Sequence, residues 1–195
     1  MVLGITGTTG VGKHTAADFL KQKGWVILDA DRIAHHLYRP YTSVWKAITE
    51  HFGEEILSKN DIIDRQKLGQ IVFNPENPEK AGKELKELNK IIHPAIIRYL
   101  KDELYHLRNK DKIAIIAALW EELKLSDICD KILLITANEK LAFQRIKARD
   151  SINKAVYDAR IKNQSIPTNP DFAINNEKDF KELYKAINDA LGGDL

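Results

Sequence analysis

The 195-residue sequence predicts an α/β fold built on a five-stranded parallel sheet, and two observations carry this prediction. Several short segments are apolar throughout, as is typical of strands that are buried on both faces of a sheet. Stretches with helical spacing of apolar residues separate these segments, as the crossovers between parallel strands require. The predicted strands are, in order, 2–6, 25–31, 112–120, 131–136 and 171–175.

The first predicted strand, 2–6, runs directly into the glycine-rich sequence GTTGVGK at 7–13. Residues 13–23 then have a helical pattern that ends at Gly24. A strand, a glycine loop and a helix in this order surround a phosphate with backbone N–H groups and the positive end of the helix. We therefore expect a bound nucleotide at Gly10, Val11, Gly12, Lys13, His14 and Thr15, with Lys13 against the β- and γ-phosphates.

The second strand is predicted to end in two carboxylates, Asp29 and Asp31. Residues two apart on a strand share a face, and the carboxyl end of a parallel strand is where ligands bind. A carboxylate there can accept the proton of an attacking hydroxyl or hold a metal through water. Asp31 is thus a candidate catalytic base, although it would also serve as the N-cap of a helix.

His14 departs from the phosphate-loop pattern G-x-x-x-x-G-K-[ST], whose last residue supplies a hydroxyl to Mg²⁺. Mg²⁺ prefers oxygen ligands, and three arrangements are open. In the first, the Thr15 hydroxyl binds Mg²⁺ in place of the missing one. In the second, the imidazole of His14 binds a softer ion such as Mn²⁺, Co²⁺ or Zn²⁺. In the third, Mg²⁺ is held by ATP oxygens, water and Asp31. We favour the third, because Mg²⁺ keeps several waters in kinase sites.

Two segments stand apart from the predicted sheet. Residues 32–110 form a mainly helical insert, in which 73–80 is predicted as a loop and Pro94 is expected to kink a helix or begin a new one. Residues 147–170 are rich in charge and are predicted to form a mobile lid. The predicted core is therefore 1–31, 111–146 and 171–195 of a single domain, and it ends in an amphipathic helix with Phe180, Leu183, Ile187 and Leu191 on one side.

Arg145 and Arg149 lie four residues apart, on one face of a predicted helix that leads into the lid. Arginine over ATP would neutralise charge that develops on a transferred phosphoryl group. A solvated basic face is the alternative interpretation. His93 and Glu121 are further candidates for ligand contact, against the alternatives of a core histidine and a helix cap.

The net charge, the apolar segments and the cysteine content indicate which partners and which cellular location to expect. The net charge of +2 gives no reason to expect a nucleic-acid partner. No segment approaches the roughly 20 apolar residues of a membrane span, and the N-terminus lacks the features of a signal peptide. Cys129 is the single cysteine, which excludes an intrachain disulfide and favours a cytoplasmic location.

Taken in order, ten short segments of this sequence resemble motifs of the dephospho-coenzyme A kinases, a family of P-loop kinases. The resemblance runs through most of the chain, and its middle motifs are more specific than the glycine loop alone. The motifs are GITGTTGVGK, VILDADRIAHHL, HFGEEIL followed by DRQKLGQIVF, IIHPAI, LWEE, CDKILLI, RIKARD, RIKNQ and DFAINN.

The resemblance implies a three-layer α/β/α P-loop kinase fold with a helical substrate-binding insert and a lid. It implies ATP-dependent phosphorylation of the ribose 3′-hydroxyl of dephospho-coenzyme A, the last step of coenzyme A synthesis, with ATP and Mg²⁺. By resemblance, Asp31 matches the proposed base, Arg149 the lid arginine and His93 a coenzyme-side motif. Lys13, Asp31 and Arg149 are accordingly the predicted catalytic residues, Arg145 and Arg149 nucleotide contacts, and Asp31, His93 and Glu121 substrate contacts.

The sequence also departs from the family pattern. His35 stands where arginine is frequent, Ala117 and Ala118 replace the usual Pro-Leu, and the stretch between Gln164 and Asp171 is shorter and less basic. Two other functions stay open. One is a nucleoside or deoxynucleoside monophosphate kinase of the same fold, and the other is a non-catalytic nucleotide-binding protein that has lost its metal with the change at His14.

Overall fold

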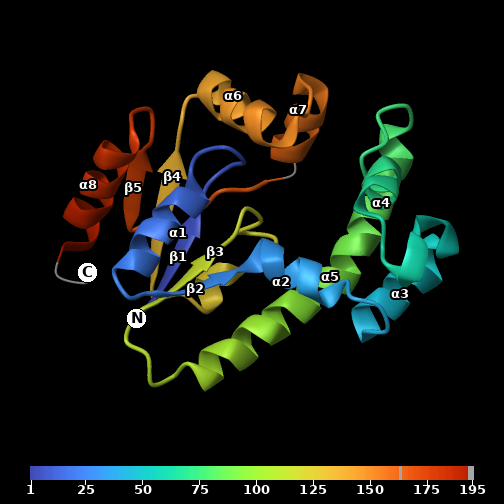
Figure 1. Ribbon diagram of the computed structural model, residues 1–195, viewed down its shortest axis with the longest axis horizontal. Coiled ribbons are helices and arrows are strands. Elements are labelled where there is room, and N and C mark those ends of the chain that lie inside the picture. Colours follow the sequence, from blue (N-terminus) through green and yellow to red (C-terminus); the bar gives the residue numbers. More distant parts are fainter. Residues whose placement is uncertain (163, 193–195) are drawn as a thin grey trace. The chain divides into compact units, whose positions relative to one another are not determined.

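The computed structural model describes residues 1–162 and 164–192 and divides the chain into two compact units, whose elements are labelled in Figure 1. The first unit comprises Met1–Ala30 and Tyr105–Leu195, and the second comprises Asp31–Leu104. Among the described residues, no helix combines the length and the apolar character that crossing a bilayer would require.

The first unit contains the parallel sheet. Its strands follow the spatial order β2-β3-β1-β4-β5, and every neighbouring pair is parallel. The five-stranded parallel sheet predicted from the sequence is therefore confirmed. Because all strands run the same way, the segments that follow them meet at one edge of the sheet. The strands are β1 (Val2–Thr6), β2 (Val26–Asp29), β3 (Ile113–Ile116), β4 (Lys131–Thr136) and β5 (Phe172–Asn175).

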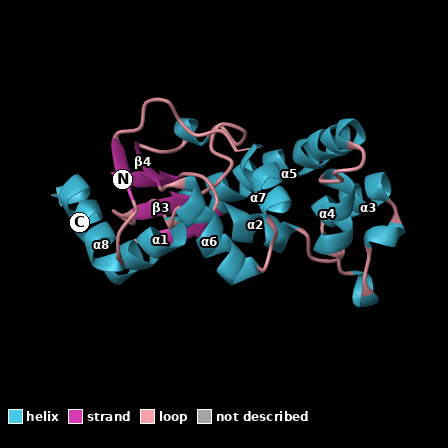
Figure 2. Ribbon diagram, turned by 90° about the horizontal axis from the view of Figure 1, so that it is seen from above, coloured by secondary structure: helices cyan, strands magenta, loops and turns pink. Residues whose placement is uncertain are grey.

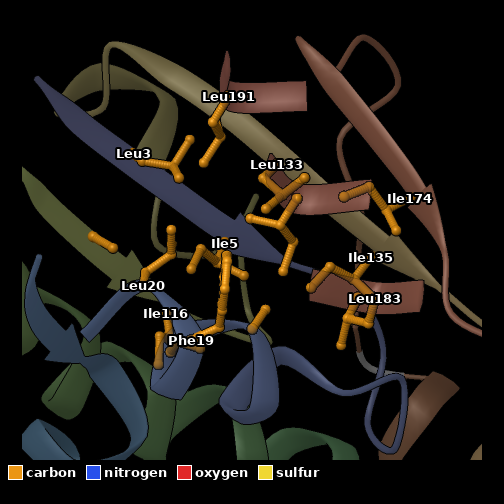
Figure 3. Packing of buried hydrophobic residues seen from close by; sticks show 14 of the residues in the cluster. Leu3, Ile5, Phe19, Leu20, Ile116, Leu133, Ile135, Ile174, Leu183 and Leu191 are labelled. Carbon is orange, nitrogen blue, oxygen red and sulfur yellow. The ribbon is translucent and has the colours of Figure 1, made fainter. Parts of the chain in front are cut away.

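Helices α1 (Lys13–Gln22) and α8 (Phe180–Leu191) lie side by side on one face of the sheet (Figures 1 and 2). Their apolar sides close over β1, β3, β4 and β5 in one buried cluster (Figure 3). Each fully buried aliphatic side chain of this kind contributes about 1.5–3 kcal/mol. This cluster holds α1 in place, and thereby also fixes the end of the glycine loop that leads into α1. Its labelled members include Leu3, Ile5, Leu20, Leu133, Ile135, Leu183 and Leu191.

Gly4 faces the opposite side of the sheet, because side chains alternate along β1 and those of Leu3 and Ile5 point into the cluster with α1 and α8. A Cβ atom on Gly4 would lie 1.9 Å from Cη2 of Trp120. Trp120 is fully buried and donates its indole N–H to Oγ of Ser126 at 3.0 Å. The absence of a side chain at residue 4 thus makes room for a tryptophan just beyond β3.

Two helices between β4 and β5 belong to the same unit. They are α6 (Glu139–Asp150) and α7 (Lys154–Lys162), and they share a small buried cluster of Ala142, Ile146 and Tyr157. The Asn138 side chain caps α6 by accepting from the N–H of Lys140 at 2.9 Å. In the described part of the chain, the predicted lid segment, 147–170, therefore comprises the end of α6, α7 and the irregular residues 164–170 that lead toward β5.

The second unit is helical. Its residues form most of α2 (Ala30–Leu37), α3 (Ser43–Phe52), α4 (Arg65–Val72) and most of α5 (Pro78–His106), with 3₁₀ turns at Glu54–Ile56 and Lys59–Asp61. Caps fix two helix starts, since the side chains of Thr42 and Asp64 accept N–H groups of α3 and α4. Buried residues of α5 recur every four positions at Leu88, Ile92, Ile96 and Leu100, which is the spacing of a helix with one packed side.

Several predicted boundaries were wrong. β2 ends at Asp29 and β3 at Ile116, so these strands are shorter than predicted. The loop predicted over 73–80 ends earlier, because Pro78 begins α5, where a missing N–H costs nothing. α5 continues through Pro94 rather than restarting there, since buried residues on both sides hold the helix. Phe180 is 67% exposed and lies outside the buried side of α8.

Candidate active site

The glycine loop has the backbone of a phosphate-binding loop. Gly10 and Gly12 have φ of 93° and 104°, in the left-handed region that favours glycine. Added Cβ atoms would come within 2.4 Å of the Ala142 carbonyl oxygen and of Nδ2 of Asn176, respectively. Gly12 is the N-cap of α1 and has no side-chain cap, so the first N–H groups of the helix face outward from its start. This is the arrangement that binds phosphate.

Lys13 is the first residue of α1 and is only 6% exposed. Its ammonium donates to the carbonyl oxygens of Gly7 at 2.8 Å and Thr8 at 3.0 Å. The lysine therefore lies back across the loop, where its charge adds to the positive end of α1. Thr15, in the same first turn, is half-buried, and Val11 is buried.

Asn176 follows β5 and fixes the loop from the other side. It is 7% exposed and donates its side-chain N–H to the Val11 carbonyl oxygen at 2.8 Å. Its own backbone is held twice, by the Thr136 carbonyl oxygen at 2.7 Å and by Nη1 of Arg145, which donates to the Asn176 carbonyl at 3.1 Å. Arg145, predicted as a nucleotide contact, is thus joined to the loop through Asn176.

The segment after α7 is attached to the loop by Gln164. Its side-chain oxygen accepts from the Thr9 N–H at 2.9 Å, and its side-chain nitrogen donates to Oγ1 of Thr9 at 2.8 Å. The next residue, Ser165, donates through both its N–H and its hydroxyl to Oε1 of Glu122, at 3.1 and 3.0 Å. Two consecutive residues therefore connect the lid segment to the glycine loop and to the turn after β3.

Glu122, rather than the predicted Glu121, makes these contacts. Glu121 is exposed, whereas Glu122 is half-buried. The proposed substrate contact at Glu121 stays a prediction. Ala117 and Ala118, which replace a Pro-Leu pair, are buried just after β3.

His14 bonds to Asp29. Its Nε2 lies 2.9 Å from Oδ2 of Asp29, the last residue of β2. The imidazole is 51% exposed, whereas the Asp29 side chain is 9% exposed. The residue that replaces the loop hydroxyl therefore faces a nearly buried carboxylate at the edge of the sheet where the strands end.

The two lid arginines share a carboxylate. Arg149 donates two hydrogen bonds to Asp150, at 2.7 and 2.9 Å, and Nη1 of Arg160 lies 3.3 Å from the same group. The bonds from Arg149 hold the pKa of Asp150 below its usual range. Arg149 is 60% exposed, and an ion pair this accessible is worth about 1 kcal/mol or less. The ion pair with Asp150 therefore adds little to what holds this guanidinium.

Two predicted residues belong to the second unit. Asp31 is exposed in the first turn of α2, and because β2 ends at Asp29, strand alternation does not relate the two aspartates as we had expected. His93 is half-buried in α5.

Within this unit, Nη1 of Arg65 lies 2.7 Å from Nε2 of His35, so a guanidinium from α4 stands beside the position where arginine is frequent in the family. Burial raises the pKa of Tyr38, the residue that follows α2, to about 12.

Among the described residues, no group of three or more His, Cys, Asp and Glu side chains is placed to hold a metal ion. Within the described part of the chain, a metal ion would therefore take only some of its ligands from the protein. That fits the way in which kinases hold their metal, through one or two protein ligands, water and the phosphates of the nucleotide.

Comparison with known proteins decides the family. The family model described as dephospho-CoA kinase matches residues 1–180. The chain belongs to the dephospho-CoA kinase family. It is 36% identical over 191 residues to the dephospho-CoA kinase of Fusobacterium nucleatum, covering 96% of this chain and 95% of that one.

Solved structures agree in fold. The dephospho-CoA kinase of Campylobacter jejuni has a TM-score of 0.63 at 22% identity, covering 98% of each chain. TT1252 from Thermus thermophilus has a TM-score of 0.76 at 24% identity, covering 99% of this chain and 97% of that one. The P-loop kinase fold that the motifs implied is thereby confirmed.

Sequence reasoning missed Asn176, Gln164, Asp150 and the pairing of His14 with Asp29. Asn176 and Gln164 both lie in motifs that carry the resemblance, DFAINN and RIKNQ. An uncharged amide has no charge pattern to mark it, however, and the partners of these two amides, Thr9 and Val11, lie more than 150 residues away in the chain.

Proposed function

We propose that this chain transfers the γ-phosphoryl group of ATP to the ribose 3′-hydroxyl of dephospho-coenzyme A. The observation that carries the proposal is the loop itself, with its left-handed glycines, its buried lysine and the uncapped start of α1, in a chain that belongs to the dephospho-CoA kinase family. This geometry supports the proposal that the nucleotide binds at Gly10, Val11, Gly12, Lys13, His14 and Thr15.

In the proposed reaction, the loop N–H groups and Lys13 hold the β- and γ-phosphates and stabilise the charge that moves onto them. The 3′-oxygen forms a bond to the γ-phosphorus as the bond to the β–γ bridging oxygen breaks, and ADP leaves. Asp31 accepts the proton of the 3′-hydroxyl. Mg²⁺, the expected ion, would neutralise phosphate charge, and Asp31 or Thr15 are its candidate ligands through water.

Arg149 and Arg145 are the proposed cationic contacts to the nucleotide. Arg145 is already bonded to the residue that fixes the loop, and Arg149 is exposed on an end of α6 from which it can move away from Asp150. His93 and Glu121 are the proposed contacts to the coenzyme. We expect no nucleic-acid or membrane partner, and a cytoplasmic location.

The decisive experiment incubates the purified chain with ATP, Mg²⁺ and dephospho-coenzyme A and follows the acceptor by mass spectrometry. One added phosphate at the ribose 3′ position, absent with Lys13→Ala, is the expected result. A parallel panel of nucleoside and deoxynucleoside monophosphates tests the other acceptor class, and phosphorylation of these alone would overturn the proposal. ATP binding with no transfer to any acceptor would indicate the non-catalytic alternative.

A further inference from the structure

The contact between His14 and Asp29 stands where a P-loop normally supplies a hydroxyl to a metal. His14 directly follows the phosphate-binding Lys13, in the first turn of α1. Asp29 ends β2, on the edge of the sheet where ligands bind in parallel α/β folds. Both residues belong to the first unit, so their relation does not depend on how the two units are placed.

The separation of the two atoms suits one metal ion. Two ligands on adjacent corners of an octahedron, each about 2.1 Å from the ion, are about 3.0 Å apart. The Nε2–Oδ2 distance is 2.9 Å. The spacing therefore allows both atoms to bind one ion that lies to one side of the line between them, once the imidazole turns so that Nε2 faces the ion and its hydrogen is carried on Nδ1.

The donor set favours a different ion from the one that a hydroxyl favours. Imidazole is an ordinary ligand of first-row transition ions, and carboxylate oxygen suits Mn²⁺ as well as Mg²⁺. Mg²⁺ prefers oxygen throughout and would keep a water in place of the imidazole. A nitrogen and a carboxylate oxygen together thus select a transition ion over Mg²⁺.

We infer that His14 and Asp29 form a two-ligand site for a divalent transition-metal ion that enters with ATP. The inference rests on the proposed function, because no third His, Cys, Asp or Glu ligand joins this pair among the described residues, and the phosphates and water must supply the rest. It selects the second of the three arrangements that the sequence left open. Mg²⁺ still supports turnover in this view, but it does so without a bond to His14.

The first measurement is spectroscopic and does not depend on phosphoryl transfer. Mn²⁺ and a non-hydrolysable ATP analogue are added to the full chain, and the electron spin-echo modulation of Mn²⁺ is recorded with ¹⁴N- and ¹⁵N-histidine. We expect coupling to a directly bound histidine nitrogen that is lost in His14→Ser and kept in His106→Gln, a change at an exposed histidine that ends α5. Mn²⁺ bound with no such coupling overturns the inference.

The second measurement compares affinities. With the analogue present, His14→Ser should weaken Mn²⁺ binding by at least about 10-fold, since even outer partners of metal ligands are worth about 10- to 100-fold. Mg²⁺ affinity should be unchanged or stronger, because serine restores the hydroxyl. Asp29→Asn should lower Mn²⁺ affinity in the same direction. An unchanged Mn²⁺-to-Mg²⁺ preference in His14→Ser would refute the site.

The two proposals fail in different ways. Binding of the analogue is measured separately by calorimetry, and thermal melting confirms that each variant is folded. If the analogue binds and histidine coupling is missing, the metal site is wrong and the proposed kinase function stands. If the analogue does not bind to the wild-type chain, both the proposed function and the metal site are refuted.

Discussion

Replacing Asn176 tests whether the phosphate loop is held in its binding conformation by one buried amide. Asn176→Ala removes the hydrogen bond to the Val11 carbonyl oxygen, which measures 2.8 Å and lies in a site where the residue is 7% exposed. The backbone bonds of residue 176 to Thr136 and Arg145 do not involve its side chain and are kept. The change therefore isolates a single contact to the loop.

The expected cost follows from burial. Leaving a buried polar group without its partner costs about 1–3 kcal/mol. In a chain of this size, 1 kcal/mol lowers the melting temperature by about 2–4 °C, so Asn176→Ala should melt roughly 2–12 °C below the wild type. Asn176→Asp keeps the size but places an acceptor against the Val11 carbonyl, and it should cost at least as much.

The adjacent asparagine is a matched control. Asn175 is exposed at the end of β5, and Asn175→Ala should change stability by no more than about 0.5 kcal/mol. The assay is thermal melting of the three variants, followed by calorimetric titration with ATP. In Asn176→Ala, part of the free energy of ATP binding must be used to order the loop, so ATP affinity should fall by up to about 150-fold. In Asn175→Ala, ATP affinity should change little.

Equal melting temperatures and equal ATP affinities for Asn176→Ala and Asn175→Ala would refute this reasoning. The loop would then keep its shape through its glycines and Lys13 alone. A drop in stability without a drop in ATP affinity would show that the amide supports the fold but not the binding conformation of the loop.

Three further changes test the proposed roles. Asp31→Asn should lower turnover by about 10²- to 10⁴-fold and leave ATP affinity within a few-fold, and full activity would leave Asp31 as a residue of the first turn of α2 only. Arg149→Ala should lower the turnover number by about 10²-fold or more with a smaller change in the Michaelis constants, and a change in the Michaelis constants alone would contradict a role in the transition state. Gln164→Ala removes both side-chain bonds to Thr9 and should raise amide hydrogen exchange in the loop, whereas Gln164→Glu should lose only the donated bond; unchanged exchange in both variants would show that Thr9 is held by other contacts.

Much of the first unit could be predicted because its signals are local. The strands β1 and β4 have the predicted bounds, and the helical pattern of 13–23 corresponds to α1, whose apolar residues Ala16, Ala17, Phe19 and Leu20 are buried. An unbroken apolar run and a helical repeat each report burial directly. The glycine loop was equally readable, since its spacing reflects backbone geometry within a few residues.

The errors arose where partners from other parts of the chain decide the outcome. Helix α5 continues through Pro94 because packing of Ile92 and Ile96 outweighs the loss of one backbone bond. Phe180 has the right spacing for the inner side of α8, yet it is exposed in the first turn of that helix. His14 was readable as a departure from a motif, but its partner Asp29 is known only when β2 and α1 are placed together in space.

The short stretch before β5 is held by hydrogen bonds at both of its ends. Gln164 and Ser165 bond to Thr9 and Glu122 at one end, and at the other the Asp171 side chain accepts the N–H of Ile132 at 2.7 Å. Only residues 166–170 lie between, which reach at most about 3.6 Å each when fully extended. A tether this short cannot swing away from the sheet while both ends hold. If Arg149 contacts the nucleotide as proposed, the movement that brings it there would have to occur in α6 and α7 rather than in this stretch, and the contacts of Gln164 with Thr9 would mark where the held stretch begins.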